Sequence, residues 1–178
     1  MAHARKLIRQ AVVAQLIAAG TAAGSRVEAT RMIPQRRATE AAIGVYTPAE
    51  ESEQDARTAP RELKRDLQLI IEGIVVGTSG VDDALDDLAE QVEAALDADD
   101  TLGGTAAESQ LLSTDLETIE DGAKTVGLVR LTYRATYYAF APVVVSAPDA
   151  FLVADVKHNP GGGVHPLNQA EDIVEPEQ

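Results

Sequence analysis

Carboxylate side chains are the most frequent groups in this sequence that could do chemistry. Six of them surround one helical segment that has no basic residue: Asp82, Asp83, Asp86, Asp87, Glu90 and Glu93. Such oxygen-rich faces attract divalent cations, but this spacing does not follow the twelve-residue loop that binds calcium. We therefore expect a solvated acidic helix face and no metal site.

The three histidines give little support for catalysis or metal binding. His3 stands near the start of the chain, and His158 and His165 bracket the glycine run 161–163. No Lys-Ser or Lys-Thr follows this run, so it is not a phosphate-binding loop. A nucleophile elbow, a His-Glu-x-x-His motif and a dinucleotide fingerprint are also missing from the sequence. We predict no catalytic residue and no cofactor, and we expect a protein that is not an enzyme.

Charge is unevenly distributed along the 178 residues, whose net charge is −14. Residues 1–40 have a net charge of +5, and residues 41–178 have a net charge of −19. The acidic body disfavours wrapping around nucleic acid, which requires clustered Lys and Arg. The chain has no cysteine, which excludes disulfides and cysteine-ligated metals. Unlike charges at the two ends favour contacts between neighbouring copies.

Two segments have apolar residues at helical spacing. The first covers residues 2–19 and ends at Gly20; its stripe consists of Leu7, Ile8, Ala11, Val12, Leu16 and Ala19. It superficially resembles a signal peptide, but Gln15 interrupts the apolar run, which favours a core-facing helix. The second covers residues 81–97, is capped by Ser79 or Gly80, and has the stripe Val81, Leu85, Leu88, Val92 and Leu96. No apolar run approaches the length of a membrane span.

Several segments are typical of strands. The strongest alternation covers residues 61–76, where Gly73 is expected to mark a bulge or bend. Residues 110–119 and 126–139 flank Asp121-Gly122, a hairpin turn signal. Shorter strands are predicted before two prolines, at 26–33 and 42–47. The acidic run 50–55 is expected to be a solvated, mobile loop.

These elements predict an α+β fold, with a mixed, mainly antiparallel β-sheet packed by two α-helices. After Ala139 the character of the chain changes, because prolines and the glycine run prevent a continuous helix or central strand. We therefore predict one domain at residues 1–139 and an extended C-terminal arm at residues 140–178.

The order of the segments is itself informative. It runs from Gly24-Ser-Arg-Val through Ala42-Ile-Gly-Val-Tyr-Thr, Glu50-Glu-Ser and Arg61-Glu-Leu to Asp82-Asp-Ala-Leu-Asp-Asp-Leu and Leu102-Gly-Gly. In this order and spacing the chain resembles the tail terminator, or tail completion, proteins of long-tailed bacteriophages. The resemblance covers about residues 4–138. The segment from Phe140 onward departs from it, since that segment is longer than expected for compact members.

The resemblance implies a structural virion protein that caps the tail tube at its head-proximal end, stops tail elongation and joins tail to head. Members form a ring, typically hexameric, through which DNA passes without specific binding. The implied partners are further copies of this chain, the tail tube protein and the head-closure or connector protein, with no membrane. The implied location is the virion neck, and the host cytoplasm during assembly. Two alternatives stay open: another head–tail connector, such as a head-closure or adaptor protein, and a soluble ligand-binding α+β regulatory module.

Three surfaces follow as expectations. An acidic channel or partner surface, which would repel phosphate, consists of Glu50, Glu51, Glu53, Asp55, Asp86 and Glu90. A basic surface between subunits consists of Arg5, Arg9, Arg36 and Arg37. The arm would dock through apolar residues, since exposed apolar runs usually mark contact sites: Val143, Val145, Phe151 and Val153.

Overall fold

In a computed structural model of the protein, the chain divides into two compact units, Met1–Ala141 and Pro142–Gln178. The structure describes residues 3–29, 41–54 and 61–140, apart from the side chain of residue 121. All of these residues belong to the first unit, and the second unit lies outside the described residues.

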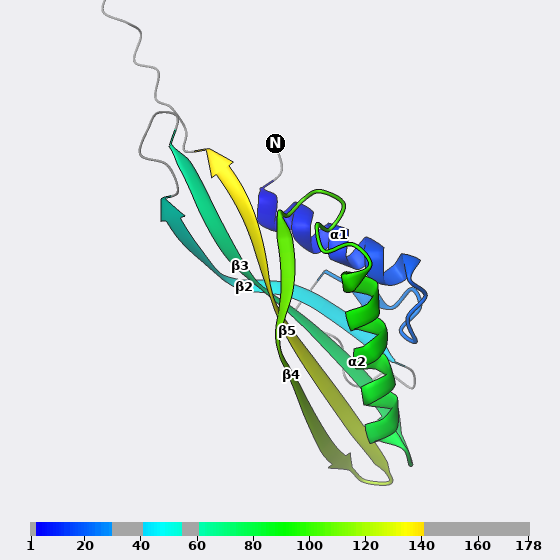
Figure 1. Ribbon diagram of the computed structural model, residues 1–178. Coiled ribbons are helices and arrows are strands. Elements are labelled where there is room, and N and C mark those ends of the chain that lie inside the picture. The colour runs from blue at the N-terminus through cyan, green and yellow to red at the C-terminus, as the bar shows by residue number, and fades with distance from the viewer. Residues whose placement is uncertain (1–2, 30–40, 55–60, 141–178) are drawn as a thin grey trace, which may run out of the picture. The chain divides into compact units, whose positions relative to one another are not determined.

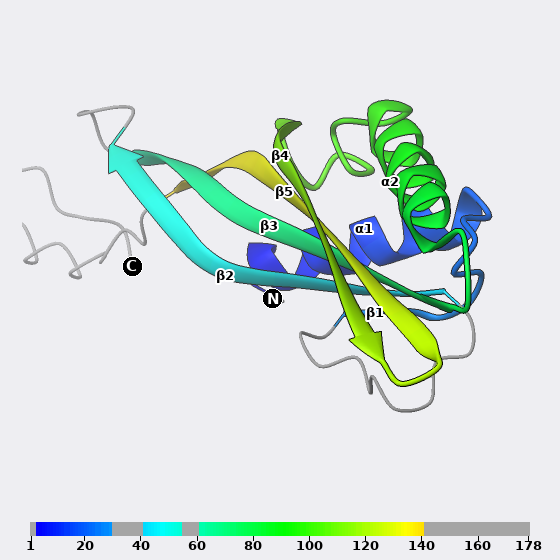
Figure 2. The same ribbon diagram turned by 90° about the horizontal axis from the view of Figure 1, so that it is seen from below.

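Helices and strands combine into a single layered fold in the described residues. In chain order the elements are α1 (Ala4–Ala18), β1 (Val27–Glu28), β2 (Ala42–Gln54), β3 (Glu62–Gly77), α2 (Val81–Asp97), β4 (Glu108–Asp121) and β5 (Lys124–Phe140). The strands form one sheet in the order β1-β2-β3-β5-β4, in which only β1 and β2 are parallel. Both helices lie on the same face of this sheet (Figures 1 and 2). The predicted α+β class is confirmed.

The helices bury the apolar stripes that their spacing predicts, although to different extents. All five stripe positions of α2 are buried: Val81, Leu85, Leu88, Val92 and Leu96. Gly80 caps α2 through its backbone alone, and Asp82 and Asp83 in the first turn complement the helix dipole. Helix α1 buries only Ile8, Val12 and Leu16, while Leu7 is 43% exposed. The predicted stripe of α1 is therefore wider than the buried one.

Two glycines determine how closely α2 approaches the sheet. A Cβ atom on Gly73 would lie 2.7 Å from Leu88 Cδ2, and one on Gly127 would lie 2.7 Å from Leu85 Cδ1. The pairing of β3 with both neighbouring strands is continuous through Gly73, so the predicted bulge or bend there is wrong. Glycine is needed at these positions because helix side chains occupy the space of its missing side chain.

Strand β2 continues through Pro48, although the sequence predicts that the strand ends there. Its pairing with β3 is irregular between Tyr46 and Ala49, so the missing N–H of the proline falls outside the regular ladder. After this irregularity, β2 pairs with the part of β3 that contains the basic side chain of Arg65. The predicted loop is therefore wrong for residues 50–54, which continue the strand, and residue 55 lies outside the described residues.

The other predicted strands differ in length or burial. Of the predicted strand 26–33, only Val27–Glu28 forms β1, and residues 30–40 lie outside the described residues. The β4–β5 hairpin and its turn are confirmed, with Gly122 at a φ of +66°. The alternation of residues 61–76 predicts one buried face for β3. Ile70 and Ile74, on the face opposite the helices, are also buried. The face of β3 opposite the helices is therefore partly apolar, with Glu72 between these two isoleucines.

The substitution Gly127→Ala should lower the free energy of unfolding by about 1–3 kcal/mol, because the added methyl group overpacks the contact with α2. The measurement is urea unfolding of the purified protein. The added methyl group would lie 2.5 Å from Val81 Cγ1 and 2.7 Å from Leu85 Cδ1, so truncation of both opposing side chains in Val81→Ala/Leu85→Ala should make room for it. The combined variant should therefore lose less stability than the sum of Gly127→Ala and this double variant. Strictly additive losses would contradict this close approach.

Candidate functional site

The carboxylate of Glu50 lies between two arginines and a tyrosine on the helix-covered face of the sheet. Arg65 Nη1 donates a hydrogen bond to Glu50 Oε1, and the hydroxyl of Tyr137 donates to Oε2 at 2.8 Å. Arg5 Nε of α1 lies 3.6 Å from the same Oε2 atom. The side chain of Glu50 is only 9% exposed. This cluster therefore connects the start of α1 to β2, β3 and β5.

The charges of this cluster stabilise one another. Burial raises the pKa of Glu50, but the hydrogen bonds from Arg65 and Tyr137 and the charges of both arginines outweigh burial. The pKa of Glu50 therefore lies below its ordinary value. Burial and the hydrogen bond to Glu50 raise the pKa of Tyr137 to about 12. Glu50 thus remains ionised, and Tyr137 neutral, across the physiological pH range.

The predicted acidic surface is not one patch. Strand alternation places Glu51 and Glu53 on the opposite face of the sheet from Glu50, and both are exposed. Asp86 and Glu90 are exposed on α2. Asp55 lies outside the described residues.

The predicted basic surface has partners within its own subunit. Arg5 pairs with Glu50, although its side chain is still 47% exposed. Arg9 Nη1 donates a hydrogen bond of 3.5 Å to Thr47 Oγ1. Between them, Lys6 is exposed on α1. The remaining predicted surface residues lie outside the described residues: Arg36, Arg37, Val143, Val145, Phe151 and Val153.

Helix α2 and strand β4 form an acidic side of the molecule. Residues 81–121 contain 14 of the 29 carboxylates and no Lys or Arg. Several hydrogen-bond donors to these carboxylates are neutral: Thr114 donates to Glu93 at 3.2 Å, and Thr101 and Gly103 donate to Asp99. Asp115 lies opposite Arg130 of β5, and the two charges attract each other. The hydrogen bond from the Thr101 side chain is the main cause of the lowered pKa of Asp99. No cation in the segment compensates its negative charge.

Strand β4 is the outer strand of the sheet, and its outer side has no partner strand in the part of the chain that the structure describes. Three large apolar side chains are exposed on it: Leu112 at 54%, Leu116 at 47% and Ile119 at 47%. Of the features that commonly protect a free edge, the strand has carboxylates and a register irregularity between Leu111 and Ser113, but no Lys and no Pro. Sequence analysis missed this surface, because a strand's edge position depends on the order of strands in the sheet. In the sequence, only these apolar residues could have indicated an exposed surface on β4.

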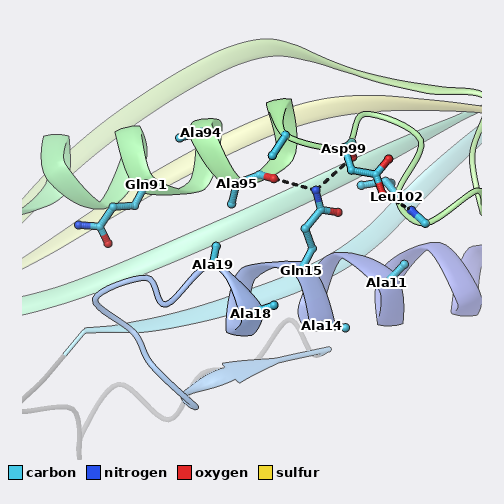
Figure 3. A pocket seen from close by; sticks show the side chains of 12 residues that line it. Ala11, Ala14, Gln15, Ala18, Ala19, Gln91, Ala94, Ala95, Asp99 and Leu102 are labelled. Carbon is cyan, nitrogen blue, oxygen red and sulfur yellow. Dashed lines mark hydrogen bonds between the residues drawn. The ribbon is translucent and has the colours of Figure 1, made fainter.

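A groove of about 640 Å³ runs between α1 and α2 and is lined mainly by alanines (Figure 3). Gln15 Nε2 donates hydrogen bonds to the backbone oxygens of Ala95 at 2.7 Å and Asp99 at 3.1 Å (Figure 3). Gln91 Oε1 accepts a hydrogen bond of 2.7 Å from the backbone N–H of Ala22. These amides connect the helices and adjacent turns, so the groove offers few converging polar groups for a ligand.

A second polar cluster lies on the sheet face opposite the helices. Glu72 Oε1 accepts hydrogen bonds from Tyr46 Oη at 2.8 Å and from Arg130 Nη2 at 2.6 Å. The bond to Glu72 raises the pKa of Arg130. These contacts join β2, β3 and β5, so we assign the cluster a structural role.

The described part of the chain contains neither a metal-binding cluster nor a helix that could span a membrane. Residues 3–29, 41–54 and 61–140 contain no group of three or more His, Asp or Glu arranged to hold a metal ion. The helices of this part are too short or too polar to cross a membrane.

Comparison with known proteins finds similarity among solved structures alone. No protein-family model matches the chain, and no curated protein matches it. Among solved structures, the chain is similar to one from the "Virion of native gene transfer agent (GTA) particle", with 14% sequence identity and a TM-score of 0.39. The match covers 74% of this chain and 94% of that chain. A similarity this low carries no argument about family or function.

The substitution Glu50→Gln should lower the free energy of unfolding at pH 7 by about 1–3 kcal/mol, because charge-assisted hydrogen bonds are lost. The contribution of Glu50 is complete above its ordinary pKa of 4.5 and disappears as the pH falls through its lowered pKa in the folded state. The stabilities of the variant and the unmodified protein should therefore converge in acid. The measurement is urea unfolding from pH 7 to about pH 3.

Glu51→Gln is the matched control, because it removes the same charge from an exposed neighbour on the same strand. It should change stability by less than about 0.5 kcal/mol. A difference between Glu50→Gln and the unmodified protein that does not vary with pH would contradict the role of the ionised carboxylate.

Proposed function

We propose that this protein is a structural virion protein that caps the tail tube at its head-proximal end, stops tube elongation and joins tail to head. The observation that carries the proposal is the ordered series of segments that resembles tail terminator proteins. The protein would act as a ring of copies, six by this resemblance. Its partners would be the tail tube protein on one side and the head-closure or connector protein on the other. No reaction is involved, and specificity lies in the surfaces.

The outer face of α2 suits the wall of a DNA channel. Asp86 and Glu90 are exposed, and the chain has no Lys or Arg between Arg65 and Lys124. A ring with this face turned inward would present several carboxylates from every copy. Electrostatic repulsion acts over about 8 Å at physiological salt, so DNA phosphates would pass without adhering to the wall.

The other predicted acids take different roles in this proposal. Glu50 is engaged by Arg65, Tyr137 and Arg5, so we assign it to the fold and not to the channel. Glu51 and Glu53 are exposed near the end of β2 and suit a partner surface.

Of the alternatives, another head–tail connector differs from a tail terminator in its position in the particle. A ligand-binding regulatory module is less well supported, because the groove between the helices is lined mainly by alanines. The amide groups of Gln15 and Gln91 in that groove already bond to the backbone. A ligand would therefore find few polar groups to determine its orientation.

Loss of the protein from a producing host should give tails of irregular, excessive length that do not attach to heads, because the end of the tube is no longer capped. Electron microscopy of lysates measures tail length, and a plasmid copy of the gene should restore normal particles. Cryo-electron microscopy of those particles should show a closed ring of this protein at the head-proximal end of the tube. A ring at the head vertex instead would favour the connector alternative, and a protein never found in particles would refute both.

The double substitution Asp86→Lys/Glu90→Lys should leave tail assembly intact and reduce DNA delivery by about tenfold or more, because cations in the channel would bind phosphate. The measurement compares infective titre or gene transfer with the number of complete particles seen by microscopy. Asp86→Asn/Glu90→Gln is the matched control, since it removes charge without reversing it, and it should have a smaller effect. Equal delivery by all three proteins would contradict the channel role of this face.

A further inference from the structure

The two helices pack side by side, α1 toward the β1 edge of the sheet and α2 over its centre. Helix α1 packs against β1, β2 and α2, whereas α2 packs mainly against β3 and β5 and less against β4. Because β1 and β4 are the outer strands of the sheet, the molecule has an α1 side and a β4 side that face in opposite directions.

The α1 side is basic and partly apolar. Helix α1 contains Arg5, Lys6 and Arg9 and no acidic residue. Two of its large apolar side chains, Leu7 and Ile17, are each 43% exposed. This helix therefore offers both cations and apolar surface to a partner.

The β4 side has the complementary character. Its free edge exposes three large apolar side chains, as described above, and its sequence contains five carboxylates and no cation: Glu108, Asp115, Glu117, Glu120 and Asp121. A free edge of this length and apolarity is a template for association unless it is covered. The charge of the edge selects a basic covering surface.

We propose that the β4 edge of one copy is covered by α1 of a second copy, so that copies join side by side in head-to-tail order. Leu112 and Leu116 of one copy would then be shielded from water by the α1 face that contains Leu7 and Ile17. The exposed cation Lys6 would face the carboxylates of β4. Arg5 and Arg9 contribute less, because they already have partners in their own subunit.

Charge excludes two other ways of covering the edge with the same chain. A two-fold pairing of β4 with β4 would place five carboxylates of one copy against five of the other. Pairing of β4 with the open end of β2 would bring the carboxylates of β4 close to Glu51 and Glu53. Like charges that lie directly opposite each other destabilise strand pairs, so neither arrangement is favoured.

This contact would explain how copies join in the proposed ring, and that role rests on the proposed function. A contact between unlike surfaces repeats from copy to copy and closes into a ring when the rotation permits. Since the contact uses the edges of the sheet, the outer carboxylates of α2 stay free to face a channel. The contact itself is a property of the purified protein and is tested there.

Cysteine cross-linking tests the contact directly, because the chain has no native cysteine. The full-length variants Lys6→Cys and Glu117→Cys are mixed at high concentration and treated with a flexible bismaleimide. The expected product is a covalent dimer in the mixture, at least tenfold more abundant than in either variant alone. A dimer from Glu117→Cys alone would show two-fold pairing of β4 and overturn the proposal.

Two controls make the result specific. Asp83→Cys replaces Glu117→Cys in one mixture, because it is exposed on α2 and does not belong to β4, and it should give no such dimer. Deletion of residues 142–178 tests the C-terminal arm as the occupant of the edge. If cross-linking survives the deletion, the arm is not required. If cross-linking disappears from a still folded protein, the arm and not α1 holds the copies together, and the proposal is wrong.

Charge exchange provides an independent measurement. Lys6→Glu and Glu117→Lys should each weaken self-association by about twofold to fivefold in sedimentation velocity, and the variant with both substitutions should recover most of the loss. Leu116→Ser should weaken it by about tenfold, since apolar burial is lost. Thermal unfolding should be unchanged in these exposed variants. Unaltered association in all of them would overturn the proposal.

The test separates this contact from the proposed function. A protein that cross-links as expected but is missing from particles would refute the tail-capping function and leave the contact standing. A protein located at the end of the tail tube whose edge variants assemble and cross-link like the controls would refute the contact alone.

Discussion

The close approach of α2 to Gly73 and Gly127 is the contact on which the rest of the described structure depends. It allows the leucines of the helix to reach the sheet itself. Each fully buried leucine stabilises the folded state by about 1.5–3 kcal/mol. The same contact determines which side of α2 faces outward, and that side is lined with carboxylates. The mutual repulsion of these carboxylates must be outweighed by apolar packing, because no lysine or arginine occurs nearby in the sequence.

Elements with a complete hydrophobic period were predictable from the sequence. The stripe of α2, the alternation of β3 and the β4–β5 hairpin each contain enough repeats to identify their type and buried face. Strand β2 was not predictable in the same way, because Pro48 and the acidic residues after it favour a loop locally. The continuation of β2 depends on its pairing with β3. Arg65 of β3, which lies far from Glu50 in sequence, compensates the charge of Glu50. Local patterns contain no information about that pairing.

The candidate surfaces were predictable in composition and not in position. The sequence shows that acids gather after Arg65 and also at residues 50–53. It does not show that strand alternation places Glu50 on one face of the sheet and Glu51 and Glu53 on the other. A carboxylate that looks like part of a solvated run is thus itself largely buried, at the centre of a partly exposed ion-pair cluster. The free edge of β4 could not be identified either, since it follows from the strand order β3-β5-β4. That order places β4, the first strand of the β4–β5 hairpin, outermost.

The separation of charge between the two sides of the sheet has a consequence for specificity. An apolar free edge would pair with any exposed strand, including its own copy, if nothing opposed it. The carboxylates of β4 oppose both self-pairing and pairing with the acidic end of β2, so they remove the commonest routes to aggregation. The same carboxylates attract the basic face of α1, which lies beside the other edge of the sheet. One distribution of charge therefore protects the edge while the protein is alone and directs association toward a single head-to-tail arrangement when copies meet.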